Sequence, residues 1–479
     1  MRSGDGNWIG WHVGAASGAR DNIRLARLAV SAALGALLAA GVCGSASAET
    51  ISSALAKAYV FSPDLNAARA ATRAVNENVA RAMSGYRPSI SATVDGGLRE
   101  REVSGSSNGP ITTQPRGYGV AVTQNLWNGN RTANSVRQAD SQVLQSREQM
   151  RQTEQTLLNN AAIAYMNVLR DTAILNLRRN NVEVLEQQLR QTQERFNVGE
   201  VTRTDVAQSE AALAQGRSEA FGSQSNLQTS LANFRQFIGE APRSLAPAQP
   251  LTALVPRSID SAIATSQRSH PLIQAALHNV DAAALAVRLA EGQLAPTVNL
   301  TGSWSNRWED SSQNQRINTT QVIGSLNIPI YEGGAVYALV RQAKEQMGQA
   351  RLQADLQREQ VRAQVVSAWG VWQNVGPLIQ AVQAQVRAAE IALNGVREEA
   401  RVGQRTTLDV LNAQQALLNA RVNLITAQRE RVVSSYSLLA TVGDLNAGRL
   451  GLAVESYDPT IHYDQVKGKW IGTRTPDGR

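Results

Sequence analysis

The side chains able to do acid–base, nucleophilic or metal chemistry are few in this chain and lie far apart. Among its 479 residues there are four histidines, and those in the second half are His270, His278 and His462. The single cysteine is Cys43. No set of histidines, cysteines and carboxylates has the spacing of a metal site, and no nucleophile elbow or phosphate-binding loop occurs. The sequence therefore predicts no enzyme activity, no bound metal and no cofactor.

Two carboxylates stand out because the segment around them is written twice. Asp205 lies in VGEVTRTDV at residues 198–206, and Asp409 lies in VGQRTTLDV at residues 402–410. Each aspartate would fall in the first turn of a helix, where the helix dipole stabilises a carboxylate by about 0.3–1 kcal/mol. This structural role and a charged functional site are both open interpretations for these two residues.

The repeated segment belongs to a duplication that covers most of the chain. An offset of 204 residues relates VRQA at 136–139 to VRQA at 340–343, and an offset of 208 relates residues 51–63 to residues 259–271. A repeat of this length indicates a duplicated structural module, not a solenoid. The predicted organisation is a signal peptide at 1–48, a first repeat at 49–239, a linker at 240–257, a second repeat at 258–445 and an irregular tail at 446–479.

The N-terminus has the features of a secretory signal. Three arginines between residues 20 and 27 precede an apolar run at 28–42, and Ala46-Ser47-Ala48 fits a cleavage site. Val42 before Cys43 does not suit lipidation, so the predicted mature chain has no cysteine and no disulfide. The formal charge of +8 does not indicate nucleic-acid binding, because the basic residues alternate with acids and glutamines and form no basic block.

Each repeat is predicted to consist mainly of helices. A short amphipathic helix (51–61 or 259–269) ends at a proline, and a helical segment of about 25 residues follows it. After a pair of strands, the stretch 131–197 contains no proline and would span about 100 Å as a helix. A return helix of about 39 residues completes the repeat. In the second repeat Gly376-Pro377 falls within the long helix, where we expect a kink or a break.

Four segments alternate between apolar and polar residues, as strands with one apolar face do. The first has Ile90, Ala92, Val94 and Leu98 on one side, and similar patterns follow near residues 118–123, 298–304 and 322–328. Strands of about ten residues with one apolar face suit a tilted crossing of a bilayer. The polar loops at 102–116 and 309–320 would then lie outside the cell. A soluble β-hairpin layered on a helix is the alternative interpretation.

Aromatic residues stand near the ends of these segments, where interfacial residues belong. They are Trp127, Trp304, Trp308 and Tyr331. Four strands cannot close a barrel in lipid, because the two edges would leave backbone groups unpaired. Closure therefore requires several chains, and three copies would give about twelve strands, within the range of outer-membrane barrels.

The chain is similar to the TolC family of outer-membrane efflux and secretion channels. The similarity runs from Thr50 to about Leu445 and rests on the two-fold repeat, on TQNLWNGN at 123–130, on LNIPIYEGG at 326–334 and on the paired Val-Gly turns. It implies an α+β membrane protein in which four transmembrane β-strands per chain contribute to a 12-stranded trimeric barrel. A long periplasmic α-helical coiled-coil barrel continues it.

The same resemblance implies a location and partners. A homotrimer in the outer membrane would extend into the periplasm and dock with a periplasmic adaptor, also called a membrane fusion protein, and an inner-membrane transporter. It would be the exit duct of a tripartite efflux or type I secretion system. The chain does not distinguish drugs from proteins as cargo, nor does it identify the transporter.

The resemblance further implies roles for the two repeated turns. Val198, Gly199, Val402 and Gly403 correspond to the tips that the adaptor grips. Asp409 corresponds to a position whose three copies ring the tunnel entrance and bind cations.

Other positions near the turns correspond to a latch that holds the closed state. These are Thr204, Asp205 and Arg405, while Ala400 replaces a tyrosine of the latch and Asn412 replaces a second acidic ring. The two replacements leave open how tightly the closed state is held. A different class also remains open, a periplasm-spanning coiled-coil scaffold or adhesin without a channel, which would be recovered without detergent.

Overall fold

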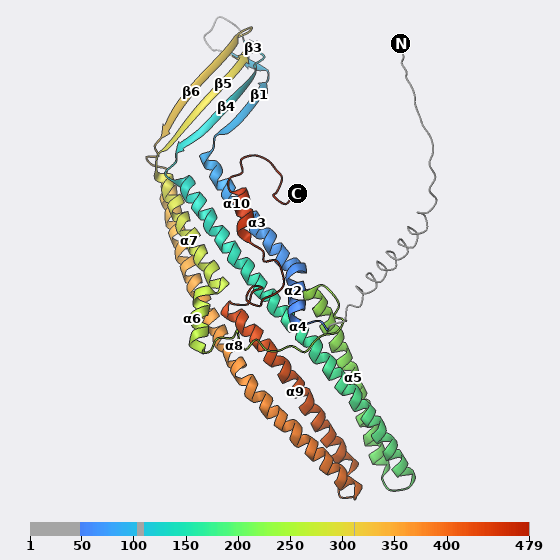
Figure 1. Ribbon diagram of the computed structural model, residues 1–479. Helices are drawn as coiled ribbons and strands as arrows, with labels where there is room; N and C mark the ends of the chain where they lie inside the picture. Colours follow the sequence, from blue (N-terminus) through green and yellow to red (C-terminus); the bar gives the residue numbers. More distant parts are fainter. Residues whose placement is uncertain (1–47, 103–109, 311, 479) are drawn as a thin grey trace, which may run out of the picture. The chain divides into compact units, whose positions relative to one another are not determined.

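The computed structural model describes residues 48–102, 110–310 and 312–478. The chain divides into two compact units, Met1–Glu49 and Thr50–Arg479, and the description below concerns the second (Figure 1). The predicted signal peptide at 1–48 lies outside the described residues apart from Ala48. Among the residues that the structure describes, no helix has both the length and the apolar character needed to cross a bilayer.

The main helices occur in pairs of equal length, one member from each half of the unit. The pairs are α2 (Ile51–Phe61) and α6 (Ile259–Ser269) with 11 residues, α3 (Pro63–Met83) and α7 (Pro271–Glu291) with 21, α4 (Arg131–Asn197) and α8 (Ala335–Arg401) with 67, and α5 (Arg203–Ile238) and α9 (Thr407–Val442) with 36. A three-residue 3-10 turn follows α3 and α7. Helices α2, α4 and α6 have the predicted bounds. Helices α5 and α9 are shorter than predicted, because each begins only after a threonine cap.

Prolines and capping side chains determine where the short helices begin. Pro63 and Pro271 are the first residues of α3 and α7. A backbone N–H at this position has no partner within the helix, so proline loses no hydrogen bond there. The residue before each proline caps the helix. The Ser62 hydroxyl oxygen accepts from the Leu65 N–H at 3.4 Å, and His270 Nδ1 accepts from the Leu272 N–H at 3.2 Å.

Helix α8 continues through Pro377, so the predicted break is not formed. A proline inside a helix removes one intrahelical hydrogen bond and crowds the preceding turn. Here the turns on both sides of the proline are held by packing, since Val375 and Ile379 are 4% and 7% exposed. The long helix therefore remains one element from Ala335 to Arg401.

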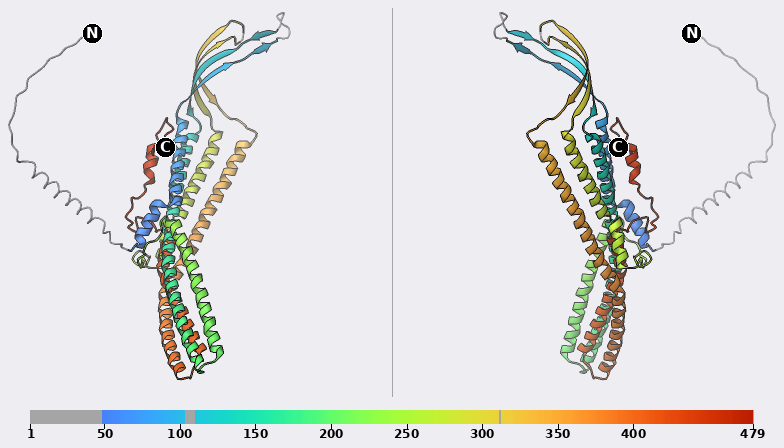
Figure 2. Two further views of the ribbon diagram at one scale, coloured as in Figure 1. Left: turned by 90° about the vertical axis from the view of Figure 1, so that its right-hand side faces the viewer. Right: turned by 90° about the vertical axis from the view of Figure 1, so that its left-hand side faces the viewer.

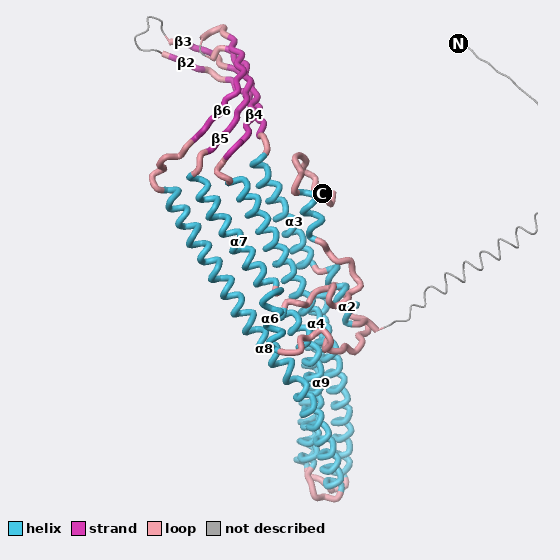
Figure 3. The backbone as a smooth tube through the Cα atoms, turned by 60° about the vertical axis from the view of Figure 1, so that its left-hand side comes forward, coloured by secondary structure: helices cyan, strands magenta, loops and turns pink. Residues whose placement is uncertain are grey.

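The two long helices run through the whole unit, and the shorter helices pack along them (Figures 1 and 3). Nearer the sheet, α3 contacts α4, α4 contacts α7, and α7 contacts α8. Farther from it, α5 contacts α4, α4 contacts α9, and α9 contacts α8. Helix α4 thus lies between two shorter helices at each level, whereas α8 has one at each level. Two helical hairpins, α4–α5 and α8–α9, form the end away from the sheet (Figure 2).

A four-stranded antiparallel sheet lies at the other end of the helices. Its strands are β1 (Ser89–Gly96), β4 (Arg116–Trp127), β5 (Thr297–Trp308) and β6 (Arg316–Asn327), in the order β1-β4-β5-β6. The two halves of the chain meet where β4 pairs with β5, with Val120 opposite Trp304. Strands β1 and β6 are the outer members, and each has one neighbour in the sheet.

Apolar side chains gather on one face of this sheet and are exposed. Cross-strand register places Ile90 with Val122, Val122 with Gly302, and Gly302 with Val322. Ile90 is 71% exposed and Val322 is 73% exposed. The opposite face carries polar residues, and there the Arg307 guanidinium lies 3.3 Å from the Asp95 carboxylate. The predicted alternation of the four segments is confirmed.

The ends of the strands differ from the prediction. Leu98 does not continue β1, because Gly96-Gly97 end the strand. Two short strands pair with each other beyond β1: β2 (Arg99–Arg101) lies just before the predicted loop at 102–116, and β3 (Ile111–Thr113) lies within it. Strand β6 begins at Arg316, so the second loop is shorter than 309–320.

The largest apolar core lies where α2, α4, α5 and α9 meet. Tyr165 and Phe234 are both fully buried there, with their ring centroids 6.3 Å apart. The linker 240–257 has no helix and packs on this core. The Tyr165 hydroxyl donates to the Ala246 carbonyl at 2.7 Å, and the Leu251 N–H donates to the Ser435 hydroxyl oxygen at 3.1 Å. The linker thereby joins the two halves of the chain.

The tail after residue 446 is irregular except for helix α10 (Pro459–Val466), which was not predicted. Eight residues are too few to show a helical period, but Asp458 before Pro459 is a capping signal, and its side chain accepts from the Thr460 N–H at 2.8 Å. Helix α10 packs against α3.

The buried His270 gives the fold a dependence on pH. Its side chain is 2% exposed, and burial, with a smaller contribution from Arg151, lowers the pKa of His270 from 6.5 to about 4. Between these two values the unfolded chain takes up a proton that the folded chain does not. Stability therefore falls as the pH decreases from 6.5 to 4, by about 1.4 kcal/mol per pH unit from this group.

We expect the substitution His270→Asn to weaken this dependence, because asparagine still caps α7 but does not titrate. The measurement is the midpoint temperature of unfolding of both proteins between pH 8 and pH 4. The substituted protein should lose less of its midpoint temperature below pH 6.5 than the original. An equal loss in both proteins would show that His270 does not stay neutral in the fold.

Candidate functional site

The two helical hairpins end in turns of the same geometry. The long helices stop at Asn197 and Arg401, and the glycines that follow, Gly199 and Gly403, have φ values of +78° and +79°. In the first turn the Glu200 N–H donates to the Arg195 carbonyl at 2.9 Å, and the second turn has the equivalent bond. Nothing lies within 4 Å of the position of a Cβ on either glycine. The positive φ, and not crowding, is therefore what requires glycine in both turns.

The valine before each glycine projects from the end of its hairpin. Val198 and Val402 are each 72% exposed. All four residues predicted as docking tips thus lie at the extreme ends of the hairpins (Figure 1). An exposed valine beside exposed backbone offers a small apolar contact to another protein.

Both singled-out aspartates take part in capping boxes. Asp205 Oδ2 accepts from the Thr202 N–H at 2.9 Å, and Asp409 Oδ2 accepts from the Thr406 N–H at 3.0 Å. Each threonine hydroxyl in turn accepts from the backbone N–H of its aspartate. The hydrogen bonds from Thr202 lower the pKa of Asp205, and those from Thr406 lower the pKa of Asp409. The structural role at the helix start is therefore formed at both positions.

One hydrogen bond joins the two turns to each other. The Thr407 side chain reaches the Asp205 carboxylate from the second turn and contributes to the lowered pKa of Asp205, although less than the two bonds from Thr202 do. Thr407 is 9% exposed although it lies at the end of the hairpin. Asp409 has no equivalent bond to the first hairpin among the described contacts. The two aspartates therefore form the same helix cap, but Asp205 alone also contacts the other hairpin among the described residues.

Further contacts connect the hairpins along their length. Nearer the linker, Arg429 Nε and the Ser437 hydroxyl of α9 donate to Asn167 and Asn159 of α4, both at 3.1 Å. Gln414 Nε2 of α9 donates to Asn181 Oδ1 of α4 at 2.9 Å. Nearer the tips, Leu411 packs in a small apolar cluster with Leu185 and Leu213. Among the described residues, few contacts hold one hairpin to the other near the tips, and that between Thr407 and Asp205 is the nearest to them.

The residues predicted as a latch are not all brought together within one chain. Arg405 forms an ion pair with Glu399 of its own hairpin at 2.8 Å, and this raises the pKa of Arg405. Asp205 bonds to Thr202 and Thr407, and Thr204 is exposed. Ala400 packs in the apolar cluster of its hairpin, and Asn412 is exposed. Thr202 and Thr406 were not predicted as site residues, although each begins a T-x-x-D pattern, which is typical of a capping box.

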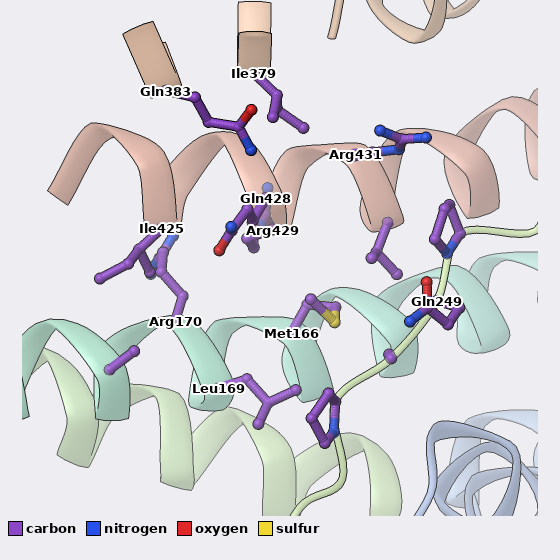
Figure 4. A pocket seen from close by; sticks show the side chains of 15 residues that line it. Met166, Leu169, Arg170, Gln249, Ile379, Gln383, Ile425, Gln428, Arg429 and Arg431 are labelled. Carbon is purple, nitrogen blue, oxygen red and sulfur yellow. The ribbon is translucent and has the colours of Figure 1, made fainter. Parts of the chain in front are cut away.

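A cavity of about 730 Å³ lies at the level of the linker, between α4, α8 and α9 (Figure 4). Met166, Ile379 and Ile425 form apolar walls. Two of its arginines are neutralised, since Arg170 Nε lies 2.7 Å from Asp171 and Arg429 Nη1 lies 2.6 Å from Glu430. Within the described part of the chain, no group of three histidine, cysteine or acidic side chains is placed to hold a metal ion.

Comparisons with known proteins agree with one another. Residues 53–240 and 262–444 match the family described as outer membrane efflux protein. The chain is 40% identical to the outer membrane efflux protein BepC of Brucella suis biovar 1 (strain 1330) over 433 residues, which cover 90% of this chain and 93% of BepC. It is 26% identical to the outer membrane protein TolC of Escherichia coli (strain K12), over 83% of each chain.

The fold is also that of solved channels. The crystal structure of the CmeC outer membrane channel of Campylobacter jejuni superposes with a TM-score of 0.75 and covers 87% of this chain and 89% of CmeC. The two sequences are 17% identical, so this likeness concerns the fold alone.

Because Thr407 contacts Asp205 of the other hairpin, we expect a substitution of Thr407 in the second turn to change hydrogen exchange in the first turn. The substitution Thr407→Val keeps the shape of the side chain and removes the donor to Asp205. A weak hydrogen bond to this largely exposed carboxylate is worth about 0.4 kcal/mol, which corresponds to about twofold faster exchange. We expect faster hydrogen–deuterium exchange in residues 198–206, followed by mass spectrometry.

The matched control is Thr406→Val, which breaks the cap of α9 and leaves Thr407 in place. It should speed exchange in residues 402–410 alone. If Thr407→Val leaves residues 198–206 as protected as before, the two turns are not coupled by this bond.

Proposed function

The chain belongs to the outer membrane efflux protein family, and on that basis we propose that it is the exit duct of a tripartite efflux or type I secretion system. It is an outer-membrane protein, and its helices extend into the periplasm. The duct is passive, since the energy for transport comes from the inner-membrane transporter. The proposal includes no catalytic step, no metal and no cofactor.

The observation that carries the proposal is the exposed apolar face of the sheet. A soluble sheet would cover such a face with helices, whereas here the helices continue from the ends of the strands and leave the face bare (Figure 2). Ile90, Val94, Val322 and Leu326 are each more than half exposed. Lipid chains are the natural cover for these side chains. A periplasm-spanning scaffold or adhesin does not account for this face.

The edges of the sheet argue for three copies. Strands β1 and β6 each have a free edge in one chain, and an open edge in lipid leaves backbone N–H and C=O groups unpaired. Pairing β6 of one copy with β1 of the next satisfies both edges. A homotrimer then has about twelve strands, which is within the range of outer-membrane barrels.

The equal lengths of paired elements support an internal two-fold repeat. Helices α2 to α5 of the first half each have a partner of the same length in the second half, and the equivalent strands β4 and β6 have 12 residues each. Each chain contributes two similar sets of helices to the tunnel, so three chains contribute six similar sets. The periplasmic part is thus a coiled-coil barrel that continues the β-barrel.

The tips of the hairpins are proposed as the docking site of the periplasmic adaptor. Val198, Gly199, Val402 and Gly403 supply apolar surface and accessible backbone at the end farthest from the sheet. Thr204, Asp205 and Arg405 are proposed to hold the closed state. Within one chain, the Asp205 carboxylate interacts with the Thr407 side chain, and the Arg405 guanidinium forms an ion pair with Glu399.

Asp409 is proposed to line the entrance of the tunnel as one of three carboxylates that bind cations. Its cap uses Oδ2 for both hydrogen bonds, and its lowered pKa keeps it charged at neutral pH. The other oxygen, Oδ1, is then available to an ion. Asp205 has the same cap, but its carboxylate also receives the Thr407 hydroxyl.

Planar-bilayer conductance of the purified protein tests this function. We expect a small, stable conductance that divalent cations block, and Asp409→Asn should raise the blocking concentration by about tenfold or more, because it removes three charges from one ring. Glu200→Gln, which removes an acidic side chain of the first turn outside the proposed latch, is the control and should leave the block nearly unchanged. Absence of any channel would refute the duct, and equal block in Asp409→Asn and the original would refute the cation ring.

A further inference from the structure

The end of the tail carries two apolar side chains that are largely exposed to solvent. Trp470 is 68% exposed and Ile471 is 88% exposed. They follow helix α10, whose last residue, Val466, is fully buried. A large aromatic and an aliphatic residue side by side, at the surface of a segment that is otherwise docked, indicate a contact with something outside the chain.

The tail is attached firmly enough to give these residues a defined position. The Tyr463 hydroxyl donates to the Asp140 carboxylate at 2.9 Å, and His462 Nδ1 lies 3.2 Å from the Asn76 side-chain nitrogen. Both contacts join α10 to the helices beside it, α4 and α3. The residues after α10 therefore cannot move far from the upper part of α3.

A second attachment places Trp470 at the foot of the sheet. The Arg87 guanidinium donates to the Lys469 carbonyl at 2.7 Å and lies 4.7 Å from the centroid of the Trp470 ring. Arg87 stands two residues before Ser89, the first residue of β1. Figures 1 and 3 show the segment after α10 rising to the level where α3 ends and β1 begins.

This level is where the apolar face of the sheet starts. Ile90, in the second position of β1, is 71% exposed, and Tyr86 just before the strand is 54% exposed. If the sheet lies in the outer membrane, as proposed above, Trp470 is at the boundary between its inner leaflet and the periplasm. Tryptophan is enriched at such boundaries, because its ring is apolar and its N–H is polar.

The charges around the two apolar residues suit an anionic lipid surface. Residues 467–478 contain the basic residues Lys467, Lys469 and Arg474 and one acidic residue, Asp477. The Lys469 ammonium donates to the Arg474 carbonyl, whereas the Lys467 ammonium pairs with the Asp464 carboxylate at 2.7 Å. Basic residues beside apolar ones favour binding to bilayers that contain anionic lipids.

We propose that Trp470 and Ile471, flanked by Lys467, Lys469 and Arg474, insert into the periplasmic leaflet of the outer membrane as a peripheral anchor for anionic phospholipid. This inference rests on the proposed function, because it needs the sheet to be in that membrane. The anchor sets the depth of the strand ends and connects the tail, through Arg87, to the start of β1.

Fluorescence quenching by lipids tests the anchor. The predicted mature chain has no cysteine, so single cysteines can be introduced and labelled with an environment-sensitive fluorophore. The variant Ile471→Cys is reconstituted as the full oligomer in vesicles of phosphatidylethanolamine and phosphatidylglycerol. Some of the lipids carry a spin label near the headgroup. Val322→Cys on the apolar sheet face is the control for lipid contact, and Val402→Cys at the hairpin tip is the control for water.

We expect lipid quenching at Ile471→Cys to resemble that at Val322→Cys and to exceed that at Val402→Cys by at least about threefold. Replacing Lys467, Lys469 and Arg474 by glutamine should reduce it, because each charge favours the inserted state by about fivefold at an anionic surface. Vesicles without phosphatidylglycerol should show the same reduction in the labelled Ile471→Cys chain that keeps its three basic residues.

Two results at Ile471→Cys would overturn the anchor. Quenching by aqueous iodide as strong as at Val402→Cys would mean that the segment stays in water. Protection from both iodide and lipid would mean that a protein surface, such as a second copy of this chain, covers it. In both cases Val322→Cys would still be quenched by lipid, and the proposed function would stand. If Val322→Cys is not quenched either, the membrane location of the sheet fails together with the anchor.

Discussion

Backbone hydrogen bonding at the two edges of the sheet is the constraint on which the rest of the molecule depends. In a single chain, strands β1 and β6 each have a neighbouring strand on one side only. The apolar face of the sheet is exposed. In water the bare face would favour aggregation, and in lipid the open edges would leave polar groups unpaired. Assembly of several chains into a closed barrel satisfies both conditions at once.

The helices transmit this arrangement to the far end of the unit. Each long helix begins a few residues after a strand and runs without interruption to a hairpin tip, so the positions of the strands determine where the tips lie. The largest apolar cluster is at the level of the linker, around Tyr165 and Phe234. Toward the tips the two hairpins share few contacts. The end of the molecule is therefore the part in which one hairpin can move against the other at low cost.

Much of the fold could be predicted from the sequence because its signals are long or repeated. A stretch of 67 residues without proline predicts α4, and the alternation around Ile90 and Val322 predicts strands with one apolar face. Of the kink or break predicted at Pro377, the break is not formed, because buried neighbours hold the helix on both sides. Helix α10 and strand β3 were not predicted, since segments of eight and three residues are too short to show a period.

The candidate site was predicted in part, for a different reason. The Val-Gly turns and Asp205 and Asp409 could be found because they occur twice, and the family membership is confirmed by the comparisons. The bond from Thr407 to Asp205 had no signal, because it joins residues about 200 positions apart and has no counterpart in the other turn. The roles of Asp409, Thr204 and Arg405 in the assembled channel stay predictions, because they concern contacts between copies.

The number of chains in the assembly tests the central claim most directly. Native mass spectrometry of the protein extracted from outer membranes in mild detergent measures it without relying on transport. The account predicts a single species of three mature chains, since three copies of a four-stranded sheet close a barrel of outer-membrane size. A folded monomer or dimer under the same conditions would contradict it, because β1 and β6 would then remain open edges in lipid.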